Sequence, residues 1–417
     1  MVSHTMAEKI LSKSAGREVH SGEYVWARPD LIYIHDILGP LTYDVYRQMN
    51  EGKGFYTGKF VIVHDHIFPP KDIQSAENVQ QMKRFSRELD AEFVKGGEGI
   101  EHTLLVERGI IKPGQLILGG DSHTVTSGAV GAMGIGMGST DIAATLALGR
   151  NWFMVPDTMK IMLSGEYPEF VTSKDIILKI LGEIGVNGAN YRAMEFHSDD
   201  GLKLSLDDRL SLSNMTVEAG AKAGMCVPSD EVFRYYADMG ESVEEILPDS
   251  SAKYFSQINL DVTDLKPQVA RPFSPDNVVD VSEVKGIELD QVYIGNCANG
   301  TLSDLREAAE ILKGSQVHSR VRLIVVPATR NIYKKALDEG LIKKLVDAGA
   351  TIAPSTCGAC AGLHMGVLGK GETALSNTNR NYRGRMGHPE SRVYLSGTYV
   401  CAASAIEGKI SDPREFA

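Results

Sequence analysis

The chain has 417 residues and a formal net charge of −11, and 43% of its residues are hydrophobic against 23% charged. That length predicts two or three domains, each able to bury its own core, with the composition of an ordinary globular protein. An acidic chain without a dense Lys/Arg run argues against nucleic acid or an anionic membrane as the main partner, and no apolar run reaches the roughly 18 residues that cross a bilayer.

Apolar runs of strand length alternate with amphipathic segments along the chain, which predicts an α/β architecture with mainly parallel sheets. In chain order, the expected strands lie within residues 59–66, 115–123, 159–167, 191–198, 290–300, 322–329 and 350–358. The expected helices lie within residues 75–94, 302–314 and 331–350. A break near 155–160 and a proline-rich run at 264–277, interpreted as a linker, predict domains 1–155, 156–270 and 271–417.

Three of the five cysteines follow expected strands: Cys297 in YIGNCANG, and Cys357 and Cys360 in STCGACAG. Because ligands gather beyond the carboxyl ends of strands in open α/β sheets, these thiols could converge on one point. Small core residues and a redox dithiol are the alternatives. Three thiolates are too few for a four-cysteine cluster, but a cubane held by three leaves one iron open as a Lewis acid.

The few cysteines, together with an N-terminal MVSHTMAEKIL that lacks the plan of a signal peptide, predict a reducing, cytoplasmic location. A close thiol pair in such a compartment is more typical of catalysis or metal binding than of a disulfide.

Residues Asp121, Ser122 and His123 end the expected strand in QLILGGDSH. If the strand continued, Asp121 and His123 would share one face as a couple able to transfer protons, whereas a turn or a helix cap is the alternative. The glycines that follow do not have the spacing of a dinucleotide-binding or P-loop motif.

The triplet His64-Asp65-His66 ends another apolar run. It could hold a metal, orient one imidazole through the carboxylate, or form a hydrogen-bonded core triplet. His102 and Glu195 are weaker candidates, each isolated in the sequence.

Arg380, Arg383 and Arg385 lie among Asn and Gly in SNTNRNYRGRMG. A solvated basic loop is one interpretation of this segment. The other is a site that grips a carboxylate, since guanidinium groups bind carboxylates through two parallel hydrogen bonds.

These motifs in this order resemble the aconitase superfamily, specifically the separate large subunits of 3-isopropylmalate dehydratase and homoaconitase. The markers are HDH, GDSHT, GSTD, NCANG, CGACAG and NRNYRGRMG, and the likeness runs from AEKIL near the start to AASAIEG near the end. The resemblance implies three α/β domains around a [4Fe-4S] cluster, with one iron not ligated by protein. The cluster ligands it implies are Cys297, Cys357 and Cys360.

The resemblance also implies roles for further residues. Catalytic roles fall to Asp65, His66, His102, Asp121, His123 and Glu195. Substrate-binding roles fall to Ser122, Asn379, Arg380 and Arg385. Arg383 is expected at the surface, and Cys226 and Cys401 in the core.

By this resemblance the chain is the large subunit of a hydro-lyase that dehydrates and rehydrates a 2-hydroxy dicarboxylic acid. We expect 3-isopropylmalate as the substrate, with homocitrate or homoaconitate and 2,3-dimethylmalate as alternatives. The family's Gly-Ser-Ser-Arg-Glu stretch does not occur in this sequence, so a separate small subunit is expected to supply the swivelling domain and catalytic serine. A cluster-free RNA-binding iron sensor is the alternative of a different class, which the negative charge disfavours.

One motif departs from the family pattern. The chain has Asn296-Cys297-Ala298-Asn299-Gly300-Thr301 where the family has Ser-Cys-Thr-Asn-Gly-Arg. We expect this change to remove the hydrogen bonds that flank the first ligand and one positive charge.

Overall fold

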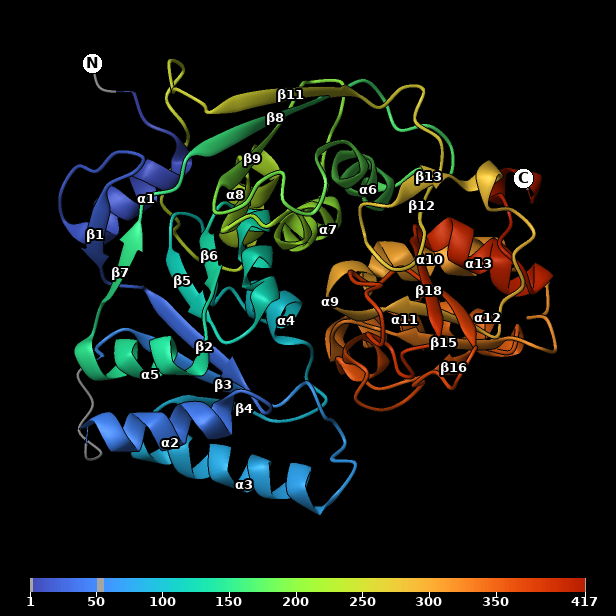
Figure 1. Ribbon diagram of the computed structural model, residues 1–417, viewed down its shortest axis with the longest axis horizontal. Coiled ribbons are helices and arrows are strands. Elements are labelled where there is room, and N and C mark those ends of the chain that lie inside the picture. The colour runs from blue at the N-terminus through green and yellow to red at the C-terminus, as the bar shows by residue number, and fades with distance from the viewer. Residues whose placement is uncertain (1–2, 51–55, 417) are drawn as a thin grey trace.

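Three open sheets, each made mainly of parallel strands, form the framework of the computed structural model, which describes residues 3–50 and 56–416 (Figure 1). Each of the seven segments expected to hold a strand does so. The α/β architecture with mainly parallel sheets is therefore confirmed.

The first sheet has five parallel strands in the order β4-β3-β2-β5-β6. Its strands are β2 (Leu31–His35), β3 (Lys59–Val63), β4 (Glu92–Val94), β5 (Leu116–Gly119) and β6 (Met133–Gly136). The helices of this region are α1 (Met6–Ala15), α2 (Gly39–Asn50), α3 (Ile73–Glu88), α4 (Glu101–Glu107), the 3-10 helix η1 (Ser122–Val130) and α5 (Ser139–Leu148). The antiparallel ribbon β1 (Tyr24–Ala27) and β7 (Asn151–Met154) lies beside it.

The second sheet has four parallel strands in the order β10-β9-β8-β11. They are β8 (Thr158–Ser164), β9 (Ala193–Ser198), β10 (Ala223–Cys226) and β11 (Ser256–Asp261). Its helices are α6 (Ser173–Ile184), α7 (Leu206–Asn214), η2 (Met215–Ala219) and α8 (Asp230–Asp238).

The third sheet has seven strands in the order β13-β12-β18-β17-β14-β15-β16, parallel except where β12 pairs with its two neighbours. The strands are β12 (Gln268–Ala270), β13 (Val278–Asp280), β14 (Gln291–Gly295), β15 (Arg322–Val326), β16 (Thr351–Ile352), β17 (Thr373–Ser376) and β18 (Arg392–Ser396). The helices are η3 (Val281–Glu283), α9 (Asn296–Asn299), α10 (Leu302–Ile311), α11 (Arg330–Asp338), α12 (Leu341–Asp347), η4 (Gly358–Ala361), α13 (Thr398–Glu407) and η5 (Pro413–Glu415).

Two expected helices differ from the prediction. In residues 75–94, helix α3 ends at Glu88, and Asp90 takes a left-handed conformation with φ 50° before edge strand β4 begins. In residues 331–350, Gly340 with φ 71° separates α11 from α12. In both segments the helix ends near a residue with left-handed backbone conformation, although the amphipathic sequence pattern continues beyond it.

The interpretation of residues 264–277 as a linker is wrong. Strand β12 occupies the middle of this run, and Gln268, Val269 and Ala270 are all buried. Although β12 falls within the predicted second domain, 156–270, it pairs with β18 and β13 of the third sheet. Prolines flank this short strand, which pairs antiparallel in an otherwise parallel sheet. A proline-rich linker and such a strand have the same composition, so composition alone could not tell them apart.

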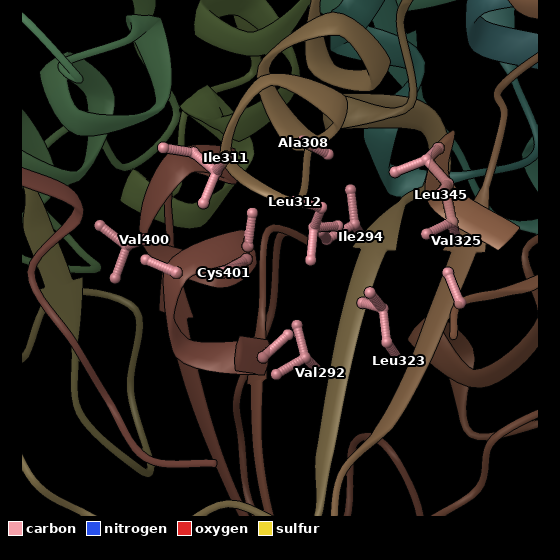
Figure 2. Close-up of a cluster of buried hydrophobic side chains, with 14 of the residues drawn as sticks. Val292, Ile294, Ala308, Ile311, Leu312, Leu323, Val325, Leu345, Val400 and Cys401 are labelled. Atoms are coloured by element: carbon pink, nitrogen blue, oxygen red, sulfur yellow. The ribbon is translucent and has the colours of Figure 1, made fainter. Parts of the chain in front are cut away.

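Both cysteines expected in the core lie there. Figure 2 shows Cys401 among the apolar side chains that fill the space beside the third sheet, including Val292, Ile294 and Val400. Cys226 is fully buried in the core around the second sheet. Across the described residues, every helix is too short or too polar to traverse a lipid bilayer.

The direction of the parallel strands determines where the candidate site lies. The carboxyl ends of β2, β3 and β5 in the first sheet meet the segments that follow β14 and β16 in the third. Hydrogen bonds join the two regions directly. The Cys357 N–H donates to the Asp65 carbonyl at 2.9 Å, and the Thr103 hydroxyl donates to the Cys297 carbonyl at 3.3 Å. Ligand-binding groups gather at such strand ends in α/β sheets.

Candidate active site

A cavity of about 310 Å³ lies where the two sets of strand ends meet. Most of the residues predicted for the site line it, and they come from both the first and the third sheet regions. They are His66, His102, Asp121, Ser122, His123, Cys297, Cys357, Cys360, Asn379, Arg380 and Arg385. Of the remaining two, Asp65 lies directly behind His66 and Glu195 lies elsewhere.

The turn after β3 is held by a carboxylate from the end of β2. Asp36 accepts backbone N–H bonds from Asp65, His66 and Ile67 at 3.0, 2.8 and 2.9 Å. Asp65 Oδ1 in turn lies 2.8 Å from His66 Nδ1, and the His64 ring bonds the Ile67 carbonyl instead. Of the three hypotheses for this triplet, the geometry favours an imidazole, that of His66, oriented by a carboxylate.

Asp121 is the centre of a network of three imidazoles. Strand β5 ends at Gly119, and of the two alternatives for this motif the structure has the helix cap: Asp121 caps η1 by accepting the His123 N–H at 2.6 Å. Its carboxylate also lies 3.1 Å from His102 Nε2, 3.3 Å from His123 Nδ1 and 3.7 Å from His66 Nε2. Burial alone would raise the pKa of Asp121, but these hydrogen bonds hold that pKa well below its usual range.

The network reaches the second sheet region through a residue that sequence reasoning missed. Glu218 Oε1, almost fully buried, lies 3.0 Å from His123 Nε2 and accepts a hydrogen bond from Arg380 Nε at 2.7 Å. Burial opposes its ionisation, yet the bonds from His123 and Arg380 lower the pKa of Glu218. Glu218 thus orients one proton-carrying group and one cationic group that both line the cavity.

Glu195 does not join the other predicted residues. Its buried carboxylate accepts the Met6 N–H at 3.0 Å and the Tyr254 hydroxyl at 2.6 Å, and it lies 2.8 Å from His197 Nε2. These contacts tie α1 to β9, so the position of Glu195 supports a role in packing rather than the catalytic role implied for it.

Backbone geometry presents the first thiol. Gly295 has φ 129°, and a Cβ at this position would stand 2.1 Å from the Val326 carbonyl oxygen, so only glycine fits. Asn296 follows with φ 86°; its side chain accepts the Cys297 N–H at 2.8 Å and donates to the Cys357 carbonyl at 2.9 Å. The departure from the family motif therefore brings hydrogen bonds of its own, which fix the two cysteine segments to each other.

The cysteine sulfurs have amide partners. Asn214 Nδ2 and Asn379 Nδ2 donate to Cys297 Sγ at 3.3 and 3.5 Å, and Cys360 Sγ donates to Asn379 Oδ1 at 3.2 Å. The hydrogen bond from Cys357 lowers the pKa of Cys360 to about 5. Burial raises the pKa of Cys297 to about 12, against the pull of its amide donors.

This donor set fits a metal group held by three sulfurs. The cavity wall carries three free thiols, and the two other cysteines lie in hydrophobic cores. Amide N–H groups aimed at a sulfur favour its thiolate form, which is the form that binds metal. Three thiols are one fewer than an ordinary four-cysteine cluster requires, so a cluster held by them would have one position free of cysteine.

Two guanidinium groups face the same cavity. Arg385 is largely buried, and within residues 3–50 and 56–416 its Nε has no hydrogen-bond partner. A buried donor of this kind is costly unless something binds it, and a carboxylate suits a guanidinium best. Arg383, by contrast, is exposed and stacks on Phe273 at 4.4 Å, which confirms the expected surface position.

Four contributing residues were not predicted. His35 stacks on His66 with ring centroids 3.8 Å apart. His35 is the last residue of β2 and Asp36 follows it, just as the triplet 64–66 follows β3. The same strand-end pattern could therefore have identified His35 and Asp36. Asn214 and Glu218 sit at the end of α7 and in η2, where the sequence gives no such signal.

Comparisons with known proteins agree with this geometry. The sequence matches the aconitase family (aconitate hydratase) over residues 8–408. The chain belongs to the aconitase family. This confirms the resemblance read from the motifs, and it makes the protein a hydro-lyase of a family whose members are generally iron–sulfur enzymes.

Similar aconitase-family proteins are found in archaea and bacteria. The chain is 47% identical to 3-isopropylmalate dehydratase large subunit 1 of Methanopyrus kandleri, over 99% of each chain. It is 47% identical to large subunit 1 of Pyrococcus abyssi, again over 99% of each. It is 45% identical to the large subunit of Oleidesulfovibrio alaskensis, over 99% of this chain and 100% of that one.

Proposed function

We propose that this chain is the large subunit of a hydro-lyase that dehydrates and rehydrates a 2-hydroxy dicarboxylic acid, with 3-isopropylmalate as its substrate. The observation that carries the proposal is one cavity that combines three thiols, two guanidinium groups and a carboxylate–imidazole network. Relatives named 3-isopropylmalate dehydratase large subunit, which match over the whole chain, support the choice of substrate.

In this proposal Cys297, Cys357 and Cys360 hold a [4Fe-4S] cluster with one iron free of protein ligands. Such an iron is a Lewis acid toward a hydroxyl group when the cluster is bound. Asn214 and Asn379, which contact Cys297 Sγ, would stabilise the thiolate and keep the sulfur oriented.

Arg385 and Arg380 would bind the substrate carboxylates. Both residues line the cavity, and Arg380 is held in place by its Nε bond to Glu218, which leaves its terminal nitrogens for the ligand. Fixed positive charge beside a carboxylate also stabilises the negative charge that spreads into it when the neighbouring carbon loses a proton. Ser122, at the start of η1, lies on the same wall and can donate to the substrate.

The imidazoles would carry protons to and from the substrate oxygen. Asp65 holds the His66 ring by a hydrogen bond to Nδ1. Burial disfavours the charged form of His66, but the negative charges of Cys357 and Asp65 outweigh burial. The pKa of His66 is therefore raised well above its ordinary value. His102 and His123 converge on the same Asp121 carboxylate. An anionic Asp121 can stabilise whichever imidazole is protonated, which suits a reaction that runs in both directions.

A separate small subunit would complete the enzyme. The relatives are named as large subunits, and the Gly-Ser-Ser-Arg-Glu stretch that carries the family's catalytic serine does not occur in this sequence. The proposed partner supplies the swivelling domain and the serine that removes the proton from carbon. The residues of this chain would then grip the acid and protonate the departing hydroxyl.

The test is anaerobic reconstitution of the chain with iron and sulfide, followed by mixing with its cognate small subunit. Turnover is measured as formation of the unsaturated acid from 3-isopropylmalate, homocitrate and 2,3-dimethylmalate in parallel. We expect cluster absorbance, and the highest kcat/KM with 3-isopropylmalate. Absence of the cluster, or of turnover with all three acids, would overturn the proposal, and a higher kcat/KM with homocitrate would overturn the substrate.

A further inference from the structure

Lys174 is a fully buried lysine in the first turn of α6, in the second sheet region. Its Nζ donates to the carbonyl oxygens of Asn377 and Thr378 at 2.9 and 2.6 Å. In the part of the chain that the structure describes, it forms no ion pair. Burying an ammonium group that is bonded only to neutral carbonyls is energetically unfavourable. Its place in the first turn of a helix disfavours the positive charge further, because the helix dipole is positive at that end.

Two neighbouring carboxylates, Asp175 and Asp304, lend negative charge to the surroundings of Lys174, but their hydrogen bonds go to other groups. Asp175, the next residue, accepts from Thr172 and from the Gln268 N–H at 2.7 Å, and it caps its own helix. Burial lowers the pKa of Lys174 to about 8, and the groups that oppose the fall are Cys401, Asp304, Cys360 and Cys297.

Two of those opposing groups are thiols of the candidate cluster site. Cys297 and Cys360 must lose their protons to bind metal, and each then becomes a buried anion. Cys401 differs, because burial in the hydrophobic core raises its pKa and keeps it neutral. Metal loading thus adds negative charge to that which Asp175 and Asp304 already provide near Lys174.

Lys174 also holds the segment that contacts the sulfurs. The two carbonyls that it binds directly precede Asn379, whose amide donates to Cys297 Sγ and accepts from Cys360 Sγ. Asn377, the first of these residues, accepts the Gly295 N–H at 2.7 Å, next to the strand end that presents Cys297. One buried side chain from the second sheet region therefore reaches two of the three cysteine segments.

We propose that Lys174 is a positioning residue of the cluster site: its buried ammonium balances the charge of the cysteine thiolates and holds the 377–379 segment against their sulfurs. The proposal rests on the proposed function, because it requires that the three cysteines bind an iron–sulfur cluster. Lys174 lies behind the cavity wall and does not line it, so it is not assigned any contact with the substrate.

The experiment compares Lys174→Met, Lys174→Gln and Lys174→Arg with the wild type, each reconstituted anaerobically. Lys179→Met is the matched control, because this lysine lies on the same helix but is 42% exposed and pairs with Glu183. Two properties are measured besides activity: the reduction potential of the bound cluster, and the rate of iron release to a chelator. Circular dichroism of each metal-free variant checks that it folds.

Loss of a nearby positive charge makes the cluster harder to reduce. For Lys174→Met and Lys174→Gln we expect at least a ten-fold fall in the equilibrium constant for reduction, a shift of about 59 mV to more negative potential for one electron. Iron release should become at least ten-fold faster. Lys174→Arg, which keeps the charge, and Lys179→Met should both remain near the wild type.

The outcomes separate the two proposals. A wild-type chain that holds no cluster refutes the proposed function, and this inference falls with it. A loaded wild type with the same potential and iron release in Lys174→Met or Lys174→Gln refutes the role of Lys174 alone. If the methionine variant does not fold, the comparison of the glutamine and arginine variants decides, since only one of them carries the charge.

Discussion

Replacing Glu218 by glutamine tests the part of the site that only the structure revealed. The carboxylate holds His123 at 3.0 Å and Arg380 at 2.7 Å, and both are charge-assisted contacts in a buried setting. Such bonds are worth about 1.5–3 kcal/mol each. Glutamine has nearly the same shape as glutamate and keeps one acceptor oxygen, so it can retain one of the two bonds. The expected loss of transition-state stabilisation is therefore that of the other bond, roughly 2–3 kcal/mol.

That free energy corresponds to a fall in kcat/KM of roughly 30- to 150-fold, since about 1.4 kcal/mol is a factor of ten. The assay is steady-state turnover of 3-isopropylmalate by the reconstituted two-subunit enzyme. A rise in KM would report the loosened Arg380, and a fall in kcat the misoriented His123. We expect both to change.

Glu195→Gln is the matched control, because Glu195 is an equally buried glutamate of the same sheet region whose partners are Met6, Tyr254 and His197. It should lower the unfolding temperature and leave kcat/KM within about three-fold of the wild type. Wild-type kinetics in Glu218→Gln together with a large kinetic loss in Glu195→Gln would refute the reasoning and return Glu195 to the catalytic set.

Further expected outcomes concern the thiols, the guanidinium groups and pH. Cys357→Ser should lose iron and turnover together, whereas Cys401→Ser, a change in the core, should keep its iron; iron content and activity measure both. Arg385→Lys should raise KM about ten- to a hundred-fold, because an ammonium cannot make the paired bonds of a guanidinium. In the metal-free protein, iodoacetamide should label the Cys357–Cys360 pair more at pH 7 than at acidic pH, because the hydrogen bond from Cys357 lowers the pKa of Cys360; peptide mass spectrometry follows the labelling. Because the pKa of Glu218 lies below its ordinary 4.5, the excess stability of the wild type over Glu218→Gln should be full above pH 4.5 and shrink as the pH falls further, as measured by thermal unfolding.

The sequence by itself determined the elements and the family. Apolar runs of strand length identified β3, β5, β8, β9, β14, β15 and β16, because strands within a parallel sheet are largely buried and therefore mostly apolar; β16, at the sheet edge with Thr351 exposed, is the exception. Cys297, Cys357, Cys360 and the aspartate–histidine pairs stood out because each follows such a run, whereas the arginine loop follows β17, a strand that was not predicted. Local conformation was less accessible: the ends of α3 and α11 depend on single left-handed residues, and β12 lies among prolines.

Only the tertiary structure decided which of these residues act together. Glu218 and Asn214, from the second sheet region, contact residues that line the cavity, whereas Glu195, from the same region, bonds to α1. All three are buried polar side chains, and a buried polar group must find a partner somewhere. The sequence shows that each of these groups needs a partner, but the partner is set by packing between the sheet regions, which no local pattern encodes.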